Sequence, residues 1–302
     1  MPKLRIKHIT TYRYRQPVAF GEHCMMLRPR DSHYQRLIDA ELVITPTPIS
    51  IREIRDAFEN HVCIARFAGR AKKLRFVSTA RLDHSHVDIH DLKVEESASS
   101  FPFSYGVQEM PDLLRFIERH PFGPERHVEQ WARTFREKNR RTDTREFLIN
   151  LTYEIKRSFK HLRRDEKGIQ TPLQTLELGS GSCRDLAVLM IDAVRSLGLA
   201  ARFVSGYLHI PGDNEPHVGG NTHAWAQVYL PGPGWVDFDP SNGIVGNRDL
   251  IRVAVVRDPH QATPLHGTWI GFPSDFVEMT VEVAVTSDAA KLEKASAISR
   301  HA

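Results

Sequence analysis

The chain has 302 residues, with 41 lysines and arginines against 37 aspartates and glutamates and a formal net charge of +4. Hydrophobic residues make up 41% and charged residues 26%, which is ordinary globular usage and excludes a wholly disordered chain. At about 150 residues per domain, this length favours two domains. Even the densest basic segment, 156–167, contains acidic residues. We interpret it as a solvated helix face and predict no nucleic-acid partner.

The three cysteines are an odd number, widely spaced and without a C-x-x-C pair. This spacing argues against a disulfide framework and against a structural zinc site. The first residues lack the apolar core of a secretory signal, and no stretch approaches the length of an uncharged membrane span. We therefore expect a cytoplasmic protein with no membrane partner, in which a lone cysteine can serve as a nucleophile.

Residues 1–95 are predicted to form an N-terminal β-sandwich. Apolar and polar side chains alternate in four segments: 4–9, 12–14, 41–44 and 62–67. Short strands at this spacing, without an amphipathic helix, are typical of a sandwich. The composition then becomes rich in serine, glutamate and proline, so we predict a linker over 96–126.

Residues 127–285 are predicted to form a second domain with helices first and antiparallel strands afterwards. Apolar residues recur at helical spacing in three segments: 127–138, 143–159 and 183–197. Five strands are expected to follow: 201–207, 224–230, 235–239, 250–256 and 277–285. This order is that of an α+β fold. The tail, 286–302, is expected to be flexible.

Cys183 has the most informative position of the three cysteines. The stretch Gly-Ser-Gly-Ser at 179–182 lets the backbone turn sharply, and Cys183 then lies in the first turn of the predicted third helix. There the unpaired N–H groups and the helix dipole favour a thiolate over a thiol. Most free cysteines are small buried hydrophobes, which is our interpretation of Cys24 and Cys63.

A thiolate nucleophile also needs a base and a group that orients the base. His223 lies forty residues after Cys183 at the start of a predicted strand, and Asp239 ends the next strand. The order Cys, His, Asp, each at the end of an element, is typical of a thiol protease. Asp237 shares a strand face with Asp239 and is the alternative partner for His223.

The turn between these two strands allows a test of the pairing. If all four residues of Pro-Gly-Pro-Gly, 231–234, form the loop, Leu230 pairs with Trp235. That register places His223 and Asp239 on opposite faces of the sheet. A triad needs a register shifted by one residue. We therefore predict an odd-length turn or a β-bulge at this point.

Several segments together resemble bacterial transglutaminase-like proteins. Four lie in the second half: Gly-Ser-Cys-Arg-Asp at 181–185, the segment 197–207, His-Ala-Trp at 223–225 and the segment 234–240. Three in the first third are similar to the β-rich region that precedes the family's core: 8–14, 27–30 and 56–60. Residues 251–271 resemble the family's core after the aspartate, so the resemblance covers about residues 4–285.

The resemblance implies a papain-like catalytic core, of helices packed on an antiparallel sheet, with a triad of Cys183, His223 and Asp239. It favours Asp239 over Asp237, because Trp-x-x-x-Asp-Pro is the family pattern. The implied chemistry is attack of the cysteine sulfur on an amide carbonyl to form a thioester, with the backbone N–H of Cys183 in the oxyanion hole. We expect a peptide or protein substrate, no cofactor and no metal.

The fate of the thioester separates the candidate functions. Release by water makes a peptidase or amidase, which is the function we expect. Release by an amine makes a transglutaminase, which is the alternative. The alternative from another class is a non-catalytic binding protein on the same fold. The complete set of Cys183, His223 and Asp239 argues against that last alternative, because a binding protein does not need all three side chains.

A histidine cluster and four other side chains allow two interpretations each. His84, His86 and His90 would share one side of an extended strand with Asp88, at spacings that could bind Zn²⁺ or Cu²⁺. An exposed polar strand gives the same pattern, and we favour that interpretation. Four further side chains could line the cleft, but we interpret them as structural: Trp225, Trp235, Arg202 and Tyr207.

Overall fold

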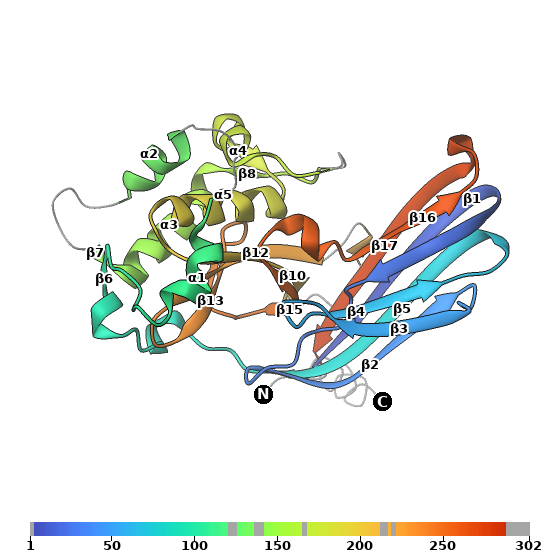
Figure 1. Cartoon of the computed structure of the whole chain (residues 1–302), viewed down its shortest axis with the longest axis horizontal. Helices are drawn as coiled ribbons and strands as arrows, with labels where there is room; N and C mark the ends of the chain where they lie inside the picture. The colour runs from blue at the N-terminus through green and yellow to red at the C-terminus, as the bar shows by residue number, and fades with distance from the viewer. Residues whose placement is uncertain are drawn as a thin grey trace, which may run out of the picture.

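The computed structural model describes residues 3–119, 126–135, 142–164, 168–211, 217–218 and 222–287. Figure 1 shows two parts side by side: a large sheet made mostly of the N-terminal strands, and a unit in which helices cover a second sheet. This mixture confirms the predicted α+β class. Within the described residues, no helix is long and apolar enough to cross a membrane.

The first sheet is organised around β1, a bent strand that spans Lys3–Met25. Its first half pairs with β5 (Arg70–His84), and its last residues pair with β4 (His61–Arg66). The register of β1 shifts after Arg13 and again after Phe20, and such irregularities bend a strand. Because β1 pairs with different strands before and after its bends, the predicted sandwich is a single sheet that curls around its core.

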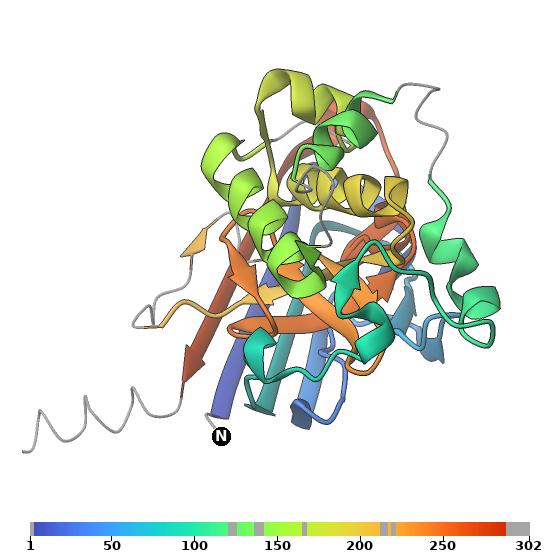
Figure 2. The ribbon, with the colours of Figure 1, turned by 90° about the vertical axis from the view of Figure 1, so that its left-hand side faces the viewer.

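The last strands of the chain return to this first sheet. β17 (Phe276–Ser287) runs antiparallel to the first half of β1, with Leu4 opposite Ser287, and β16 (Leu265–Ile270) pairs with the second half. Figures 1 and 2 show β17 in red beside β1 in blue. The other strands of this sheet are β2 (Gln35–Thr45), β3 (Ser50–Arg55) and β11 (His217–Val218).

The predicted domain limits therefore need a correction at the C-terminal end. The predicted catalytic domain spans 127–285, but the structure pairs 265–287 with β1. The alternating pattern of β17 indicated a strand, whereas its partner lies at the other end of the chain and leaves no local signal. Of the tail expected at 286–302, the first two residues belong to β17, and 288–302 lie outside the described residues.

The second unit is built on a five-stranded antiparallel sheet in the order β14-β13-β12-β10-β15. Helix α5 (Cys183–Ser196) packs on β12 and β10, and every side chain from Asp185 to Arg195 is buried. Helix α3 (Thr144–Ser158) begins where Asp143 accepts the N–H of Arg145 at 2.9 Å. The strands are β10 (Ala201–Leu208), β12 (Thr222–Leu230), β13 (Gly234–Asp239), β14 (Ile244–Val245) and β15 (Leu250–Val256).

The region predicted to be a linker is folded where it is described. Phe101 stacks on Phe147 of α3 with the ring centroids 4.5 Å apart, and Tyr105 and Leu113 pack around Ala200. These apolar anchors lie among serines and prolines that suggested an open segment. Residues 120–125 lie outside the described residues.

The remaining elements are α1 (Met110–Ile117), α2 (His127–Arg133), α4 (Pro172–Leu178), β6 (Ser100–Phe101), β7 (Thr142–Asp143), β8 (Lys160–His161) and β9 (Ser180–Gly181).

Two amide side chains from the first sheet cover the outer edge of the second. β15 is the last strand in its sheet, so its outer N–H and C=O groups need partners. Asn60 donates to the carbonyl of Val255 at 2.8 Å and accepts its N–H at 2.9 Å. Gln35 makes the same two bonds with Arg252, both at 2.8 Å. Asn60 ends the segment 56–60, so that family-like segment joins the two sheets.

Candidate active site

Cys183 is the first residue of α5, in the first turn where the sequence predicts it. The turn before it is a capping box: the Ser182 hydroxyl accepts the N–H of Asp185 at 3.4 Å, and the Asp185 carboxylate accepts the N–H of Ser182 at 2.8 Å. The Cys183 side chain is half-buried. It therefore lies at the positive end of a helix dipole, which favours a thiolate.

The Asp185 carboxylate fixes the backbone around Cys183. It is fully buried, and it accepts hydrogen bonds from the Arg164 guanidinium at 2.8 and 3.0 Å and from the N–H of Gln170 at 2.8 Å. Burial opposes ionisation of Asp185, but Arg164 and the other donors lower its pKa. A buried carboxylate with this many donors holds the preceding loop and the start of α5 in one geometry.

The hairpin of β12 and β13 has the shifted register that a triad requires. Leu230 pairs with Gly234 and not with Trp235, so the loop has an odd length, and Gly232 within it has a φ of +100°. The prediction of an odd-length turn is confirmed. His223 and Asp239 consequently share a face, and His223 Nε2 lies 2.7 Å from Asp239 Oδ2.

Two residues in the turn after β13 hold the Asp239 carboxylate. Ser241 donates to Oδ1 from its hydroxyl at 2.7 Å and from its N–H at 2.9 Å, and the Asn242 amide donates to Oδ2 at 2.8 Å. Because Asp239 is fully buried, these donors replace the water that an ionised carboxylate loses on burial. No pattern in the sequence predicts this role for Ser241 and Asn242.

Asp237, the alternative partner of His223, has other contacts. It accepts the Trp225 indole N–H and the Gln227 amide, both at 2.7 Å. Trp225 is fully buried, and its ring stacks on that of His223 with centroids 5.9 Å apart. Asp237 therefore positions Trp225 beneath the imidazole, and Asp239 is the aspartate that contacts His223.

The thiol, the imidazole and the carboxylate form one hydrogen-bonded chain. The Cys183 and His223 side chains are hydrogen-bonded, and His223 is bonded to Asp239. Burial opposes a thiolate, but hydrogen bonds and charge from His161 and His223 lower the pKa of Cys183 to about 6. Burial also opposes an imidazolium, but Asp239 raises the pKa of His223 to about 10. A thiolate–imidazolium pair at neutral pH can attack a carbonyl and then protonate a leaving amine.

His161 is a neighbour of Cys183 that the sequence analysis missed. Its side chain is hydrogen-bonded to the Cys183 thiol, and it lies on β8 beside β9. We interpreted 156–167 as a solvated helix face, but α3 ends at Ser158 and the chain then turns toward Cys183. The parallel pairing of β8 with β9 depends on tertiary folding, so no local pattern predicts it. Residues 165–167 of that segment lie outside the described residues.

Two family models match the chain. Residues 4–83 match the bacterial transglutaminase-like N-terminal region, and residues 129–240 match the transglutaminase-like superfamily. The chain is a transglutaminase-like protein. The second match contains Cys183, His223 and Asp239, whereas neither match reaches β16 or β17. The pairing of β16 and β17 with the first sheet therefore lies outside the residues that the two family models match, and it is seen only from the structure of this transglutaminase-like chain.

Relatives match nearly the whole chain, and a solved structure shares its fold. Uncharacterized proteins of Mycobacterium tuberculosis and Mycobacterium bovis are 27% identical to this transglutaminase-like chain over 93% of its length and 92% of theirs. A proposed cysteine protease from Cytophaga hutchinsonii superposes with a TM-score of 0.70, at 19% identity, over 95% of this chain and 91% of its own, which is a likeness of fold. The superfamily match on this fold supports a papain-like, cysteine-type enzyme.

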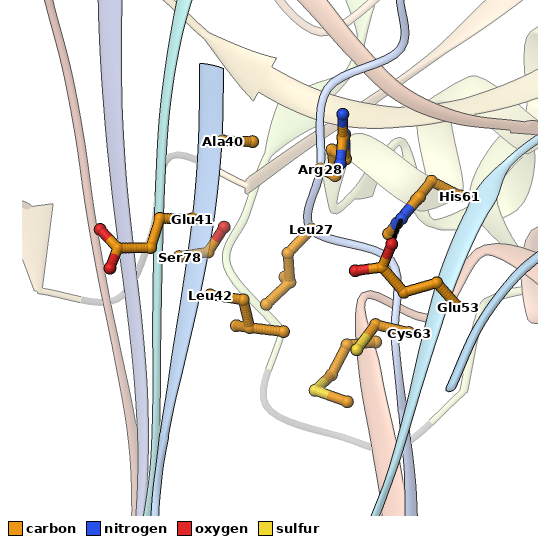
Figure 3. A pocket seen from close by; sticks show the side chains of 10 residues that line it. Leu27, Arg28, Ala40, Glu41, Leu42, Glu53, His61, Cys63 and Ser78 are labelled. Carbon is orange, nitrogen blue, oxygen red and sulfur yellow. Dashed lines mark ion pairs between the residues drawn. The ribbon is translucent and has the colours of Figure 1, made fainter. Parts of the chain in front are cut away.

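The other two cysteines of the transglutaminase-like chain lie in the first sheet, away from the site. Cys63 borders a small cavity of about 50 Å³ with Leu27 and Leu42 (Figure 3). Burial, with the charge of Glu53, raises the pKa of Cys63 to about 11, and burial also raises the pKa of Cys24. Both side chains stay neutral at physiological pH, which agrees with their interpretation as packing residues.

The histidine cluster near residue 86 does not have the geometry that a metal site needs. β5 ends at His84, which is buried with its Nε2 3.2 Å from the carbonyl oxygen of Leu250. A 3₁₀ turn at Ile89–Asp91 then breaks the strand alternation on which the metal interpretation rested. Among the described residues, no group of three His, Cys, Asp or Glu side chains could hold a metal ion.

Arg202 and Tyr207 have structural contacts. The Arg202 guanidinium carbon lies 4.1 Å from the centroid of a Trp235 ring, and Arg202 Nε donates to the Gln227 side chain at 2.8 Å. The Tyr207 hydroxyl donates to the carbonyl of Leu27 at 3.2 Å, which joins β10 to the first sheet. These contacts agree with the interpretation that neither side chain belongs to the site.

Proposed function

We propose that this protein is a cysteine-dependent amidase or peptidase that works through a thioester on Cys183. The observation that carries the proposal is the hydrogen-bonded chain from Cys183 through His223 to Asp239. A helix start, a strand start and a strand end each contribute one side chain. A thiol beside an oriented base is the arrangement that makes cysteine a nucleophile. The match to the transglutaminase-like superfamily supports the same chemistry.

In the proposed reaction, the Cys183 thiolate attacks the amide carbon, and the π electrons of the carbonyl move onto its oxygen. The backbone N–H of Cys183 has no acceptor within its own helix and can donate to that oxygen. When the carbonyl re-forms, the C–N bond breaks and the amine leaves with the proton of His223. A water molecule then transfers a proton to His223 and attacks the thioester, which releases the acid and the Cys183 sulfur.

Asp239 has an orienting role in this proposal. Its Oδ2 lies 2.7 Å from His223 Nε2, so Nδ1 is the ring nitrogen left to face the thiol. The carboxylate stays ionised, because the charge and hydrogen bond of His223, with the donors of Asn242 and Ser241, hold its pKa low despite burial. The carboxylate thus fixes the ring orientation and stabilises the imidazolium through both halves of the reaction.

We propose hydrolysis as the fate of the thioester; Cys183 is partly exposed, which lets a small nucleophile such as water reach it. The test incubates the protein with glutamine-containing and ordinary peptides, with and without an added amine, and identifies the products by mass spectrometry. Cleaved or deamidated peptide is the expected product. An amine adduct in preference to acid would favour the transglutaminase alternative.

The matched variants for this assay are Cys183→Ala and Cys63→Ala. Cys183→Ala should abolish turnover, whereas Cys63→Ala should keep it, because Cys63 lies in the other sheet. Full activity of Cys183→Ala would end the proposal. Tight binding of peptides without any product would favour the non-catalytic binding protein.

A further inference from the structure

Two histidines contact the Cys183 sulfur, and they differ in their surroundings. His223 is buried and bonded to Asp239, which suits a residue that carries the proton. His161 is exposed, and no ion pair to a carboxylate is found for it among the described residues. Its side chain is nevertheless hydrogen-bonded to the same thiol. The proposed reaction uses only one of these two rings.

The backbone holds His161 against the segment that precedes the nucleophile. Lys160 donates its N–H to the carbonyl of Gly179 at 2.8 Å, and Leu162 donates to the carbonyl of Gly181 at 2.9 Å. His161 therefore lies opposite Gly181, two residues before Cys183. With a backbone hydrogen bond on each side of it, the backbone of His161 is fixed beside the segment that leads into Cys183.

The attack on an amide needs hydrogen-bond donors about 3 Å from the carbonyl oxygen, on which the negative charge develops. That oxygen is bonded to the carbon that the sulfur attacks, so a donor beside the sulfur can reach the oxygen when the carbonyl points toward that donor. The backbone N–H of Cys183 supplies one donor. His223 delivers its proton to the leaving amine and is not available for the oxygen.

We propose that a ring N–H of His161 is the second donor of the oxyanion hole, an inference that rests on the proposed function. In the resting enzyme this N–H is hydrogen-bonded to the sulfur, which carries the negative charge. When the C–S bond forms, the charge moves to the carbonyl oxygen, and the hydrogen bond moves with it. His161 transfers no proton, so atoms and charges balance as in the scheme with His223 alone.

The test compares His161→Ala, His161→Gln and the neighbouring control Lys160→Ala. Removing one oxyanion donor typically costs 10²–10³-fold in kcat, so we expect about a 100-fold fall for His161→Ala, with KM changed less than threefold. His161→Gln keeps an N–H donor, so its kcat should be at least tenfold higher than that of His161→Ala. Lys160→Ala should match the wild type. Unchanged melting temperatures would show that the exposed side chains leave the fold intact.

Alkylation of Cys183 by iodoacetamide separates the oxyanion role from activation of the thiol. Displacement of iodide forms no oxyanion, so the alkylation rate of His161→Ala at pH 8.5 should stay within threefold of the wild-type rate. A kcat unchanged in His161→Ala would overturn the proposal. So would an alkylation rate that falls as far as kcat, because His161 would then act on the thiol itself.

Two further results distinguish this proposal from the proposed function. If Cys183→Ala keeps its turnover, the proposed function fails whatever His161 does. If wild-type protein is alkylated at Cys183 but turns over no amide, the oxyanion role of His161 fails together with that function. Turnover that needs Cys183 and is insensitive to His161 leaves the proposed function intact and removes only the second donor.

Discussion

The first sheet and the helical unit each hold a partly or fully buried cysteine, with opposite consequences. Burial raises the pKa of the Cys63 thiol in the sheet to about 11, and Glu53 adds to the effect. Burial acts in the same direction on Cys183, but His161 and His223 reverse the outcome to about 6. The comparison teaches that burial does not decide whether a cysteine is reactive. The side chains that face the sulfur decide it.

The strongest test of this comparison removes the negative charge of Asp239, which stabilises the protonated ring of His223. Asp239→Asn should lower kcat by about 10³–10⁴-fold, because a neutral amide no longer fixes the ring orientation or stabilises the imidazolium. The matched control is Asp237→Asn, in which the new Oδ1 can still accept from Trp225 and Gln227. It should stay within about fivefold of the wild-type kcat. A larger loss in the Asp237 variant would reverse the assignment of the two aspartates.

The second test measures both thiols in one sample. At pH 7, ionisation and intrinsic nucleophilicity together should make Cys183 react with iodoacetamide about 30- to 90-fold faster than Cys63. Because its pKa is lowered, the thiolate forms above about pH 6, so the labelling rate of Cys183 should rise through that value. Peptide mapping by mass spectrometry gives both rates. A midpoint near the ordinary thiol value, above pH 8, would contradict the ion-pair description.

The third test alters the backbone beside the nucleophile and leaves its partners in place. A Cβ on Gly181 would lie 2.8 Å from the Cβ of Asp185 and 3.0 Å from Gln170 Oε1. Gly181→Ala should therefore shift Cys183 and lower kcat by about 10-fold or more, because small misplacements at a reacting atom are costly. The control is Gly106→Ala, at an exposed position with room for a methyl group. Equal kcat in both variants would show that this turn tolerates movement.

The smallest effect on activity is expected from the contact between the two parts. Asn60→Ala removes two hydrogen bonds to the edge strand β15 and should lower the free energy of unfolding by about 1–3 kcal/mol. Urea denaturation measures this loss, with Asn150→Ala, an exposed amide on α3, as the control. The labelling midpoint of Cys183 near pH 6 should not move. A shifted midpoint would mean that the first sheet also tunes the thiol.

Local patterns were sufficient to predict the parts of the site that depend on spacing along the chain. The place of Cys183 in the first turn of a helix and the register of the β12–β13 hairpin follow from nearby residues, and the structure agrees with both. His161 and the pairing of β17 with β1 could not be predicted in this way. Both depend on contacts between distant segments, and β8 is too short to have a hydrophobic period of its own.

The segment predicted to be a linker is a second case in which local sequence was not sufficient. Serines and prolines near residue 100 indicated an open segment, yet Phe101 is buried against Phe147. Phe101 anchors this polar segment because the ring of Phe147 stacks against it. That partner comes from a helix more than forty residues later in the sequence. Composition therefore gave the wrong expectation for a segment whose order depends on tertiary packing.

The pairing of β1 with β17 also has a consequence for synthesis on the ribosome. β1 emerges long before β17, the strand that completes its outer side. At about 5–20 residues per second, the nascent sheet waits roughly 15–60 s with the edge of β1 open. During that interval the exposed edge can pair with another nascent chain. Chaperone binding to the emerging N-terminal strands would therefore protect this edge until β17 is synthesised.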